Sequence, residues 1–207
     1  MTRWVDLSRP VGPGMPVFPG DPGFAAEPAA TVAGDGFAVT RLHLGTHTGT
    51  HVDAPAHVVP GGPTVEELPL ELFSGTALVL DVRGRAVIEA EDVRPAAGAR
   101  IVLLRTGWDG FAGTGREFDH PFLTAAAARA LRAGGTRTTG IDAASVDGPG
   151  TLAAHRVLLG TRPDPGVVVE NLRGLEGLPA EVEFCAFGWA LTGGDGSPVR
   201  AVARPAR

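Results

Sequence analysis

The sequence predicts a single α/β domain in which a mixed β-sheet carries a few packed helices. The chain has 207 residues, a length that suits one domain with a substantial core. Several short apolar runs rich in β-branched residues predict strands, and one alanine-rich segment predicts a helix. The 30 glycines and 18 prolines are spread along the chain, so they indicate many turns and no interdomain linker. We therefore expect residues 1–207 to form one domain.

The first predicted element is a strand over residues 43–53, where residue types alternate with a period of two. One face carries histidines, glycines and Asp53, and the other carries leucines, threonines and Val52. Glycines and threonines are frequent here and oppose a helix. We expect the chain to bend near Gly49 and the strand to end at Pro55, which places His57 in the following loop.

The other elements follow in chain order. A short helical turn is expected at 65–71, interrupted by Pro69. Apolar, β-branched runs predict strands at 77–82, 101–105, 167–169 and 182–191. The clearest helix spans 124–133, because Thr124 can serve as N-cap, alanines favour the helical state and Gly134-Gly135 stops it.

Composition excludes several classes of function. The net charge is −5 and the arginines are scattered, which argues against a nucleic-acid partner. The absence of lysine excludes Schiff-base chemistry and a phosphate-binding P-loop lysine. The single cysteine, Cys185, lies in an apolar context and excludes an internal disulfide, which favours a reducing, cytoplasmic location. No apolar run reaches membrane-spanning length and the N-terminus has no secretory apolar core, so no membrane partner is expected.

One segment concentrates groups that bind metals or move protons near neutral pH. Alternate residues of a strand lie about 6.5–7 Å apart, so His51 and Asp53 can converge on one ion, and a bend near Gly49 would bring in His47. Burying several imidazoles and a carboxylate without a common partner is costly. Both groups are ordinary ligands of zinc and manganese. The segment therefore predicts a metal site, and it holds four of the six histidines: His43, His47, His51 and His57.

The run His47-Thr-Gly-Thr-His51-Val-Asp53-Ala-Pro55-Ala-His57 resembles the signature of the cyclase superfamily of metal-dependent hydrolases, which includes bacterial kynurenine formamidase and isatin hydrolase. The resemblance runs almost end to end and implies the family's compact β/β/α fold and a homodimer or homotetramer. Further segments that match in order include Asp6-Leu-Ser-Arg-Pro-Val, Pro16-Val-Phe-Pro-Gly-Asp21, Gly140-Ile-Asp-Ala-Ala-Ser-Val-Asp147 and Gly194-Asp-Gly-Ser-Pro-Val-Arg200.

The resemblance also implies roles for individual residues. His57 would be the general acid/base, and Phe18 matches an aromatic position, often tryptophan, that lines the substrate pocket. Residues 186–191 depart from the family's pattern, because a lysine is lost and Trp189 is gained. The separation of His155 and Glu170 is a few residues longer than expected, around 161–165. The implied ligands of one or two Zn²⁺ or Mn²⁺ ions per subunit are His47, His51 and Asp53, joined in two-metal members by His155 and Glu170.

The expected activity is metal-assisted hydrolysis of a C–N bond in a small aryl formamide, amide or lactam, with His57 taking a proton from the activated water. Two alternatives stay open. The same site could promote cyclisation, dehydration or isomerisation in a natural-product pathway. A closed shell of protein ligands would instead indicate a non-catalytic metal-binding protein.

Other polar groups favour structural interpretations. Ser145 lies between Asp142 and Asp147 without a nucleophile elbow, which favours a turn. His120 is interpreted as local structure. His43 either orients a metal ligand or is exposed. Trp108 and Phe111 either line the pocket or pack elsewhere.

Overall fold

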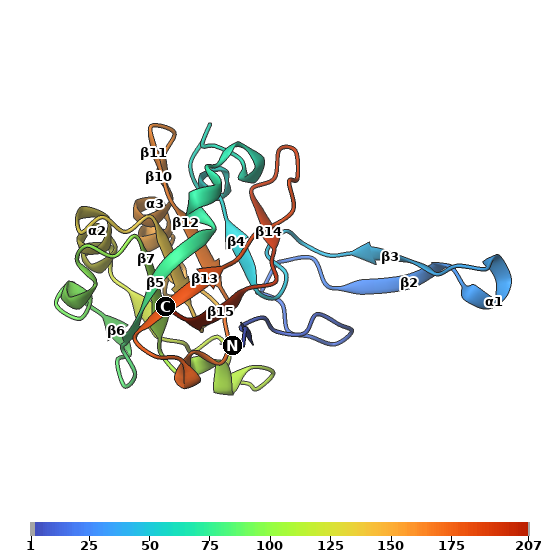
Figure 1. Cartoon of the computed structure of the whole chain (residues 1–207), viewed down its shortest axis with the longest axis horizontal. Coiled ribbons are helices and arrows are strands. Elements are labelled where there is room, and N and C mark those ends of the chain that lie inside the picture. The colour runs from blue at the N-terminus through green and yellow to red at the C-terminus, as the bar shows by residue number, and fades with distance from the viewer. Residues whose placement is uncertain (1–2, 207) are drawn as a thin grey trace.

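The computed structural model describes residues 3–206 and confirms the predicted α/β fold. Within these residues a nine-stranded mixed sheet has the order β1-β15-β13-β5-β7-β9-β12-β4-β14 (Figure 1). The four central strands, β5, β7, β9 and β12, are parallel, and the flanking pairs are antiparallel. The strands are β1 (Val5–Asp6), β4 (His51–Asp53), β5 (Ser74–Asp81), β7 (Ile101–Arg105), β9 (Thr138–Ile141), β12 (Val167–Glu170), β13 (Glu181–Cys185), β14 (Gly196–Pro198) and β15 (Val202–Pro205).

Both faces of the sheet are covered, as continuous apolar strands such as β7 require. Ile101 and Leu103 of β7 enter one core, whereas Val102 and Leu104 enter the other. Helices α2 (Ala125–Ala133) and α3 (Ala153–Leu159) cover the second core. The first core is closed by the curled strands β13 and β15 and by short 3₁₀ helices.

Several predicted elements agree with the structure. The strand at 101–105 is β7, and those at 77–82 and 167–169 fall on β5 and β12. Thr124 caps α2 by accepting a hydrogen bond from Ala127 N at 3.1 Å. The turn at 65–71 consists of two 3₁₀ helices, η2 (Val65–Glu67) and η3 (Leu70–Leu72), separated at Pro69.

Two predicted strands were wrong in part. The strand at 182–191 was too long: β13 ends at Cys185, where its register with β5 ends at Ser74, and beyond it Gly188 forms only an isolated bridge with Val199. The strand at 43–53 is broken, because β3 (Val39–His43) stops before β4 begins and residues 46–50 form a turn followed by bends. The predicted bend is confirmed at Gly49, whose φ is 66°. His57 lies in a 3₁₀ helix, η1 (Pro55–His57), and not in a loop.

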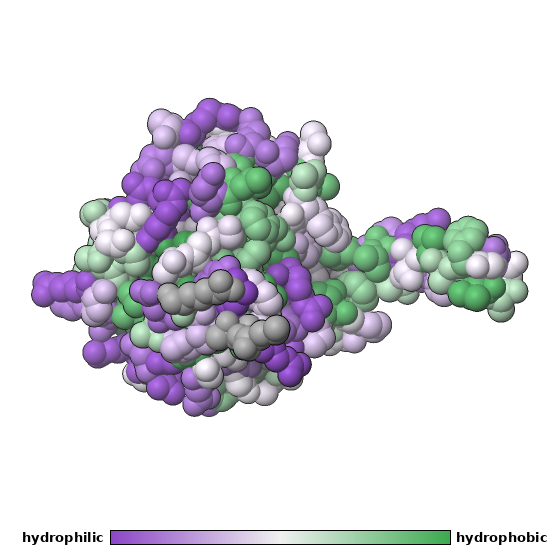
Figure 2. All heavy atoms as spheres, viewed as in Figure 1, coloured by the Kyte–Doolittle hydropathy of each residue, from purple (hydrophilic) through white to green (hydrophobic). Residues whose placement is uncertain are grey.

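A long hairpin, missed by the sequence analysis, projects from the body (Figure 1). It consists of β2 (Ala25–Ala30) and β3, with the four-residue helix α1 (Val32–Asp35) at its tip. We call residues 25–43 the arm. Every side chain of β3 is exposed. Apolar and polar residues mix on the surface of the arm (Figure 2).

The remaining elements are short. β10 (Gly160–Thr161) and β11 (Asp164–Pro165) form a hairpin between α3 and β12, while β6 (Val87–Ile88) and β8 (Phe122–Leu123) form a parallel pair. Single 3₁₀ turns are η4 (Arg94–Ala96), η5 (Trp108–Phe111) and η6 (Leu175–Gly177). Among residues 3–206, no helix combines the length and apolar character needed to cross a bilayer.

Candidate metal centre

Two side chains of the predicted site come from β4. His51 and Asp53 share one face of this strand, and their side chains are only 3% and 1% exposed. The last residue of β12, Glu170, lies directly opposite His51 in the sheet register. His51 Nε2 is 3.2 Å from Asp53 Oδ1 and 3.6 Å from Glu170 Oε2. Strand pairing therefore brings Glu170 to His51 and Asp53, although it lies far from them in the sequence.

His155 joins this group from α3, which packs against β12. Asp147 accepts hydrogen bonds from the backbone N–H groups of Ala154 and His155 at the start of the helix. Its Oδ2 also accepts a hydrogen bond from His155 Nδ1 at 2.7 Å. The other ring nitrogen, His155 Nε2, faces Glu170 Oε1 at 3.2 Å and Asp53 Oδ2 at 3.4 Å. The residues around 161–165, where the resemblance implies extra length, form the β10–β11 hairpin and leave this convergence intact.

His47 reaches the group from the turn that precedes β4. Its Nδ1 lies 2.6 Å from Asp53 Oδ1, so the bend at Gly49 brings it to the site as predicted. Its Nε2 lies 3.1 Å from Asp195 Oδ2. Asp195 stands immediately before β14, the edge strand that pairs with β4.

The electrostatics of this cluster depend on its carboxylates. Burial disfavours the charged form of Asp53, but the neighbouring imidazoles outweigh burial and hold its pKa well below the usual range. Burial also opposes a charge on His47, yet Asp53 and Asp195 raise its pKa to about 9. Among the described residues, the buried Asp53 Oδ2 has no hydrogen-bond partner. The cluster thus contains three imidazoles and two carboxylates, and one carboxylate oxygen makes no hydrogen bond within residues 3–206. These groups are a set of ligands that fits divalent cations.

His57 lies at the edge of this cluster, with 28% of its side chain exposed. Its ring centroid is 4.1 Å from that of His47 and 5.7 Å from that of His155. Burial lowers the pKa of His57; the charge of Asp53 opposes this effect, and the neighbouring imidazoles of His47 and His155 add to it. The ring is therefore neutral near pH 7 and can accept a proton.

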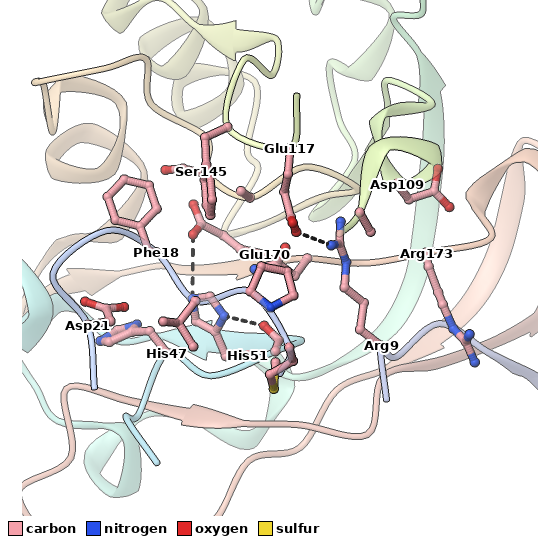
Figure 3. A pocket seen from close by; sticks show the side chains of 18 of the residues that line it. Arg9, Phe18, Asp21, His47, His51, Asp109, Glu117, Ser145, Glu170 and Arg173 are labelled. Carbon is pink, nitrogen blue, oxygen red and sulfur yellow. Dashed lines mark hydrogen bonds and ion pairs between the residues drawn. The ribbon is translucent and has the colours of Figure 1, made fainter. Parts of the chain in front are cut away.

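The cluster forms the base of a pocket of about 580 Å³, a size typical of small-molecule sites (Figure 3). Phe18 lines this pocket and packs edge-to-face against Phe118 with ring centroids 5.8 Å apart. On another wall, Arg9 Nη1 lies 2.6 Å from Glu117 Oε1, and both side chains are almost fully buried. The pocket thus combines an apolar wall with a fixed ion pair.

Most of the other residues singled out in the sequence have the structural roles that were expected for them. Ser145 lines the pocket but accepts a hydrogen bond from Asp147 N within a turn. His120 is buried and pairs with the carbonyl of Pro121. His43 is exposed on β3. Trp108 donates to backbone carbonyls and stacks on Phe111, and neither residue lines the pocket. Cys185 is half-buried, and burial raises the pKa of its thiol.

The sequence analysis missed four residues of this site. Asp147 and Asp195 appeared within segments that resembled the family, and the only role considered for Asp147 was that of a turn residue. Arg9 also lies in such a segment, but nothing indicated its pairing with Glu117, because the pair joins an N-terminal segment to a distant loop. An aspartate eight residues before a candidate ligand histidine was the one available hint for Asp147.

This fold and this centre define a class: an α/β protein with a buried imidazole–carboxylate cluster at the base of a pocket, an arrangement suited to a metal-dependent enzyme. The Cyclase family model matches residues 5–148, and the chain belongs to this family. Kynurenine formamidase of Salinibacter ruber is 38% identical over 181 residues, which cover 80% of this chain and 79% of that protein. Kynurenine formamidase of Bacillus cytotoxicus is 33% identical over 213 residues, covering 99% and 98%. The structure of isatin hydrolase A from Labrenzia aggregata, bound to benzyl benzoate, is similar with a TM-score of 0.83 at 25% identity, covering 100% of this chain and 94% of that one.

Proposed function

We propose that this protein is a metal-dependent hydrolase that cleaves a C–N bond in a small aryl formamide, amide or lactam. The convergence of His47, His51, Asp53, His155 and Glu170 at the base of a pocket carries this proposal. The similarity to kynurenine formamidases over nearly the whole chain supports the same reaction class.

The proposed ligands form two overlapping groups that share Asp53. Potential ligand atoms of His47, His51 and Asp53 lie within 4.8 Å of one another, as do those of Asp53, His155 and Glu170. Two adjacent groups are compatible with one or two ions per subunit. Imidazole and carboxylate donors suit Zn²⁺ or Mn²⁺.

A divalent cation in this site would lower the pKa of a water molecule and polarise the substrate carbonyl. We assign the proton transfers to His57, which lies beside His47 at the pocket and whose lowered pKa leaves it neutral. His57 accepts the proton of the attacking water and returns it to the leaving nitrogen. No residue of the pocket needs to form a covalent intermediate.

The aromatic wall supports an aryl substrate. Phe18 and Phe118 present an edge-to-face pair to the pocket, a geometry that a further aromatic ring can extend. The related isatin hydrolase A binds benzyl benzoate, which also carries aromatic rings. Phenylalanine at position 18 provides apolar contact without the N–H donor of an indole, so we assign Phe18 a packing role toward the substrate.

We further propose a cytoplasmic homodimer or homotetramer. The exposed apolar residues of the arm support self-association, because an isolated two-stranded hairpin is marginally stable in water. The single cysteine supports a reducing compartment.

Metal analysis combined with product mass tests the proposed function. The purified protein is stripped with a chelator, reloaded with Zn²⁺ or Mn²⁺ and assayed on aryl formamides, amides and lactams. Hydrolysis adds one water to the mass of the substrate, and we expect activity only in the reloaded samples. An unchanged mass or the loss of one water would instead favour isomerisation or dehydration. Metal binding without turnover on any substrate would favour a binding protein.

The variant His57→Gln separates the proton transfer from metal binding. We expect metal content to be retained and kcat to fall by about 10²–10⁴-fold, the usual contribution of general acid–base catalysis. The matched control is His43→Gln, because His43 is exposed on the arm. Full activity of the metal-loaded His57→Gln protein would contradict the assigned role.

A further inference from the structure

Two imidazoles of the metal centre are held by an acceptor outside the cluster. His51 donates its Nδ1–H to the carbonyl of Gly49 at 2.9 Å, and His155 donates its Nδ1–H to Asp147 at 2.7 Å. Each bond directs Nδ1 to the outer acceptor, so Nε2 is the nitrogen that faces the carboxylates and can bind a cation. Acceptors that hold the second nitrogen of a ligand histidine orient the ring and raise its basicity.

The third imidazole, that of His47, is oriented the other way round. Its Nδ1 points to Asp53 Oδ1 at 2.6 Å, and its Nε2 points to Asp195 Oδ2 at 3.1 Å. His47 lies in a turn and not in a strand, so the sheet does not fix its ring. A side-chain acceptor is therefore the means by which this ring is held.

We propose that Asp195 is the positioning residue of the metal centre: it accepts the Nε2–H of His47 and leaves Nδ1 free to bind a cation. This inference rests on the proposed metal-dependent function. It makes Asp195 the counterpart of Asp147 and of the Gly49 carbonyl. All three imidazoles of the cluster then have one outer acceptor each.

Asp195 is suited to this role because its own position is fixed. Its side chain is 43% exposed, but Thr46 Oγ1 donates to its Oδ1 at 2.9 Å. Its backbone carbonyl accepts Ala54 N at 2.9 Å, just beyond the end of β4. The next residue, Gly196, pairs with Asp53, and a Cβ there would come within 2.8 Å of His47 Cε1. A glycine beside Asp195 thus allows the His47 ring to approach closely.

The distances indicate that Asp195 holds the ring of His47 and not that of His57. His57 Nδ1 lies 3.7 Å from Asp195 Oδ2, which is longer than a hydrogen bond. The distance from His47 Nε2 is within bonding range. Removing Asp195 should therefore act on metal binding first and on proton transfer second.

Zinc affinity tests this inference, measured by competition with a chromogenic chelator for the wild type, Asp195→Asn and Asp195→Ala. We expect Asp195→Ala to weaken zinc binding by about 10–100-fold, the usual effect of losing an outer partner of a ligand histidine. Asp195→Asn should lose less, because its amide oxygen can still accept the Nε2–H. The matched control is Glu66→Ala, since Glu66 holds the same loop through Gly193 N at 2.7 Å but contacts no imidazole of the centre. Its zinc affinity should stay within about twofold of the wild type.

Nitrogen-15 NMR of the histidine side chains gives a second readout in the zinc-loaded wild type. We expect His47 to be protonated at Nε2, whereas His51 and His155 are protonated at Nδ1. Protonation of His47 at Nδ1, or equal zinc affinity in Asp195→Ala and the wild type, would overturn the inference. A wild-type protein that binds no zinc or manganese, or that hydrolyses substrates equally well after chelation, would instead overturn the proposed function.

Discussion

At the scale of single residues, the site is organised around the carboxylate of Asp53. Its Oδ1 lies 2.6 Å from His47 Nδ1 and 3.2 Å from His51 Nε2, and its Oδ2 lies 3.4 Å from His155 Nε2. A buried carboxylate needs compensating positive charge. In the metal-free chain, protons on the imidazoles provide this charge. A bound cation would replace those protons, so metal and protons compete for the same nitrogens.

This competition predicts how pH affects the metal-free protein. The pKa of His47 is raised from 6.5 to about 9, so its stabilising contribution is complete below pH 6.5 and is lost as pH rises through about 9. The contribution is about 3 kcal/mol. We expect the Tm of chelator-treated protein to fall between pH 6.5 and 9, measured by differential scanning calorimetry.

The variant His47→Gln is the control for this prediction, because it removes the titrating group while retaining a polar side chain. Its fall in Tm over the same pH range should be smaller than that of the wild type. Zinc affinity of the wild type should rise with pH, since fewer protons must leave. A Tm independent of pH from 6.5 to 9 would contradict the assignment of a proton to the His47–Asp53 pair.

The sequence predicted the residues of β4 because their chemistry lies in one short segment. Alternation alone places His51 and Asp53 on one face, and Gly49 marks the bend that brings in His47. The outer partners depend on contacts between distant segments instead. Asp195 is 148 residues from His47 and reaches it only through the pairing of β14 with β4. No local pattern encodes that pairing.

At the scale of elements, helix α2 was predictable and helix α3 was not. The N-cap of α2, Thr124, and its terminating glycines are local signals. The N-cap of α3, Leu152, makes no side-chain hydrogen bond, and Asp147 satisfies the first N–H groups of this helix from five residues further upstream. The arm was missed for a related reason: its strand β2 is rich in alanine and lacks the β-branched residues that predict strands.

The ion pair between Arg9 and Glu117 links two elements across the pocket. Arg9 follows β1, and Glu117 lies in the loop after η5, where its Oε2 also accepts Gly113 N at 2.8 Å. The side chains are 11% and 5% exposed. Removing one partner of a buried pair leaves an uncompensated charge, which costs roughly 3–5 kcal/mol. We expect Glu117→Gln to lower the free energy of unfolding by about this amount, as measured by urea denaturation.

The double variant Arg9→Met with Glu117→Gln tests the physical reason for that loss. Replacing the arginine by an apolar side chain removes the unpaired charge, so much of the lost stability should return. An exposed pair provides the matched control: Glu27→Gln, which breaks the pair with Arg41 on the arm, should cost at most about 1 kcal/mol. Equal effects of Glu117→Gln and Glu27→Gln would indicate that the pocket pair is not buried in solution.

At the scale of the whole molecule, the arm is a part whose side chains do not enter either core of the body. It carries exposed apolar side chains, with Val32, Phe37 and Leu42 at 69%, 59% and 48% exposure. The body carries a second exposed apolar group in Phe187 and Trp189, at 46% and 55%. Large exposed apolar groups commonly mark interaction surfaces. Two such surfaces on one chain allow reciprocal contacts between two copies, as in a symmetric dimer.

Shortening the arm tests this proposed self-association. Replacing residues 27–41 by Asn-Gly retains the facing residues Ala26 and Leu42 and closes them with a favoured two-residue hairpin turn. We expect the wild type to sediment as a dimer or tetramer and the shortened chain to sediment as a monomer at the same micromolar concentration. Because the arm contributes no residue to the buried clusters, the shortened chain should still unfold cooperatively. The control Leu70→Ser removes a 66% exposed apolar residue elsewhere and should leave the assembly unchanged. A monomeric wild type, or a shortened chain with unchanged mass, would show that the arm does not join copies of this protein.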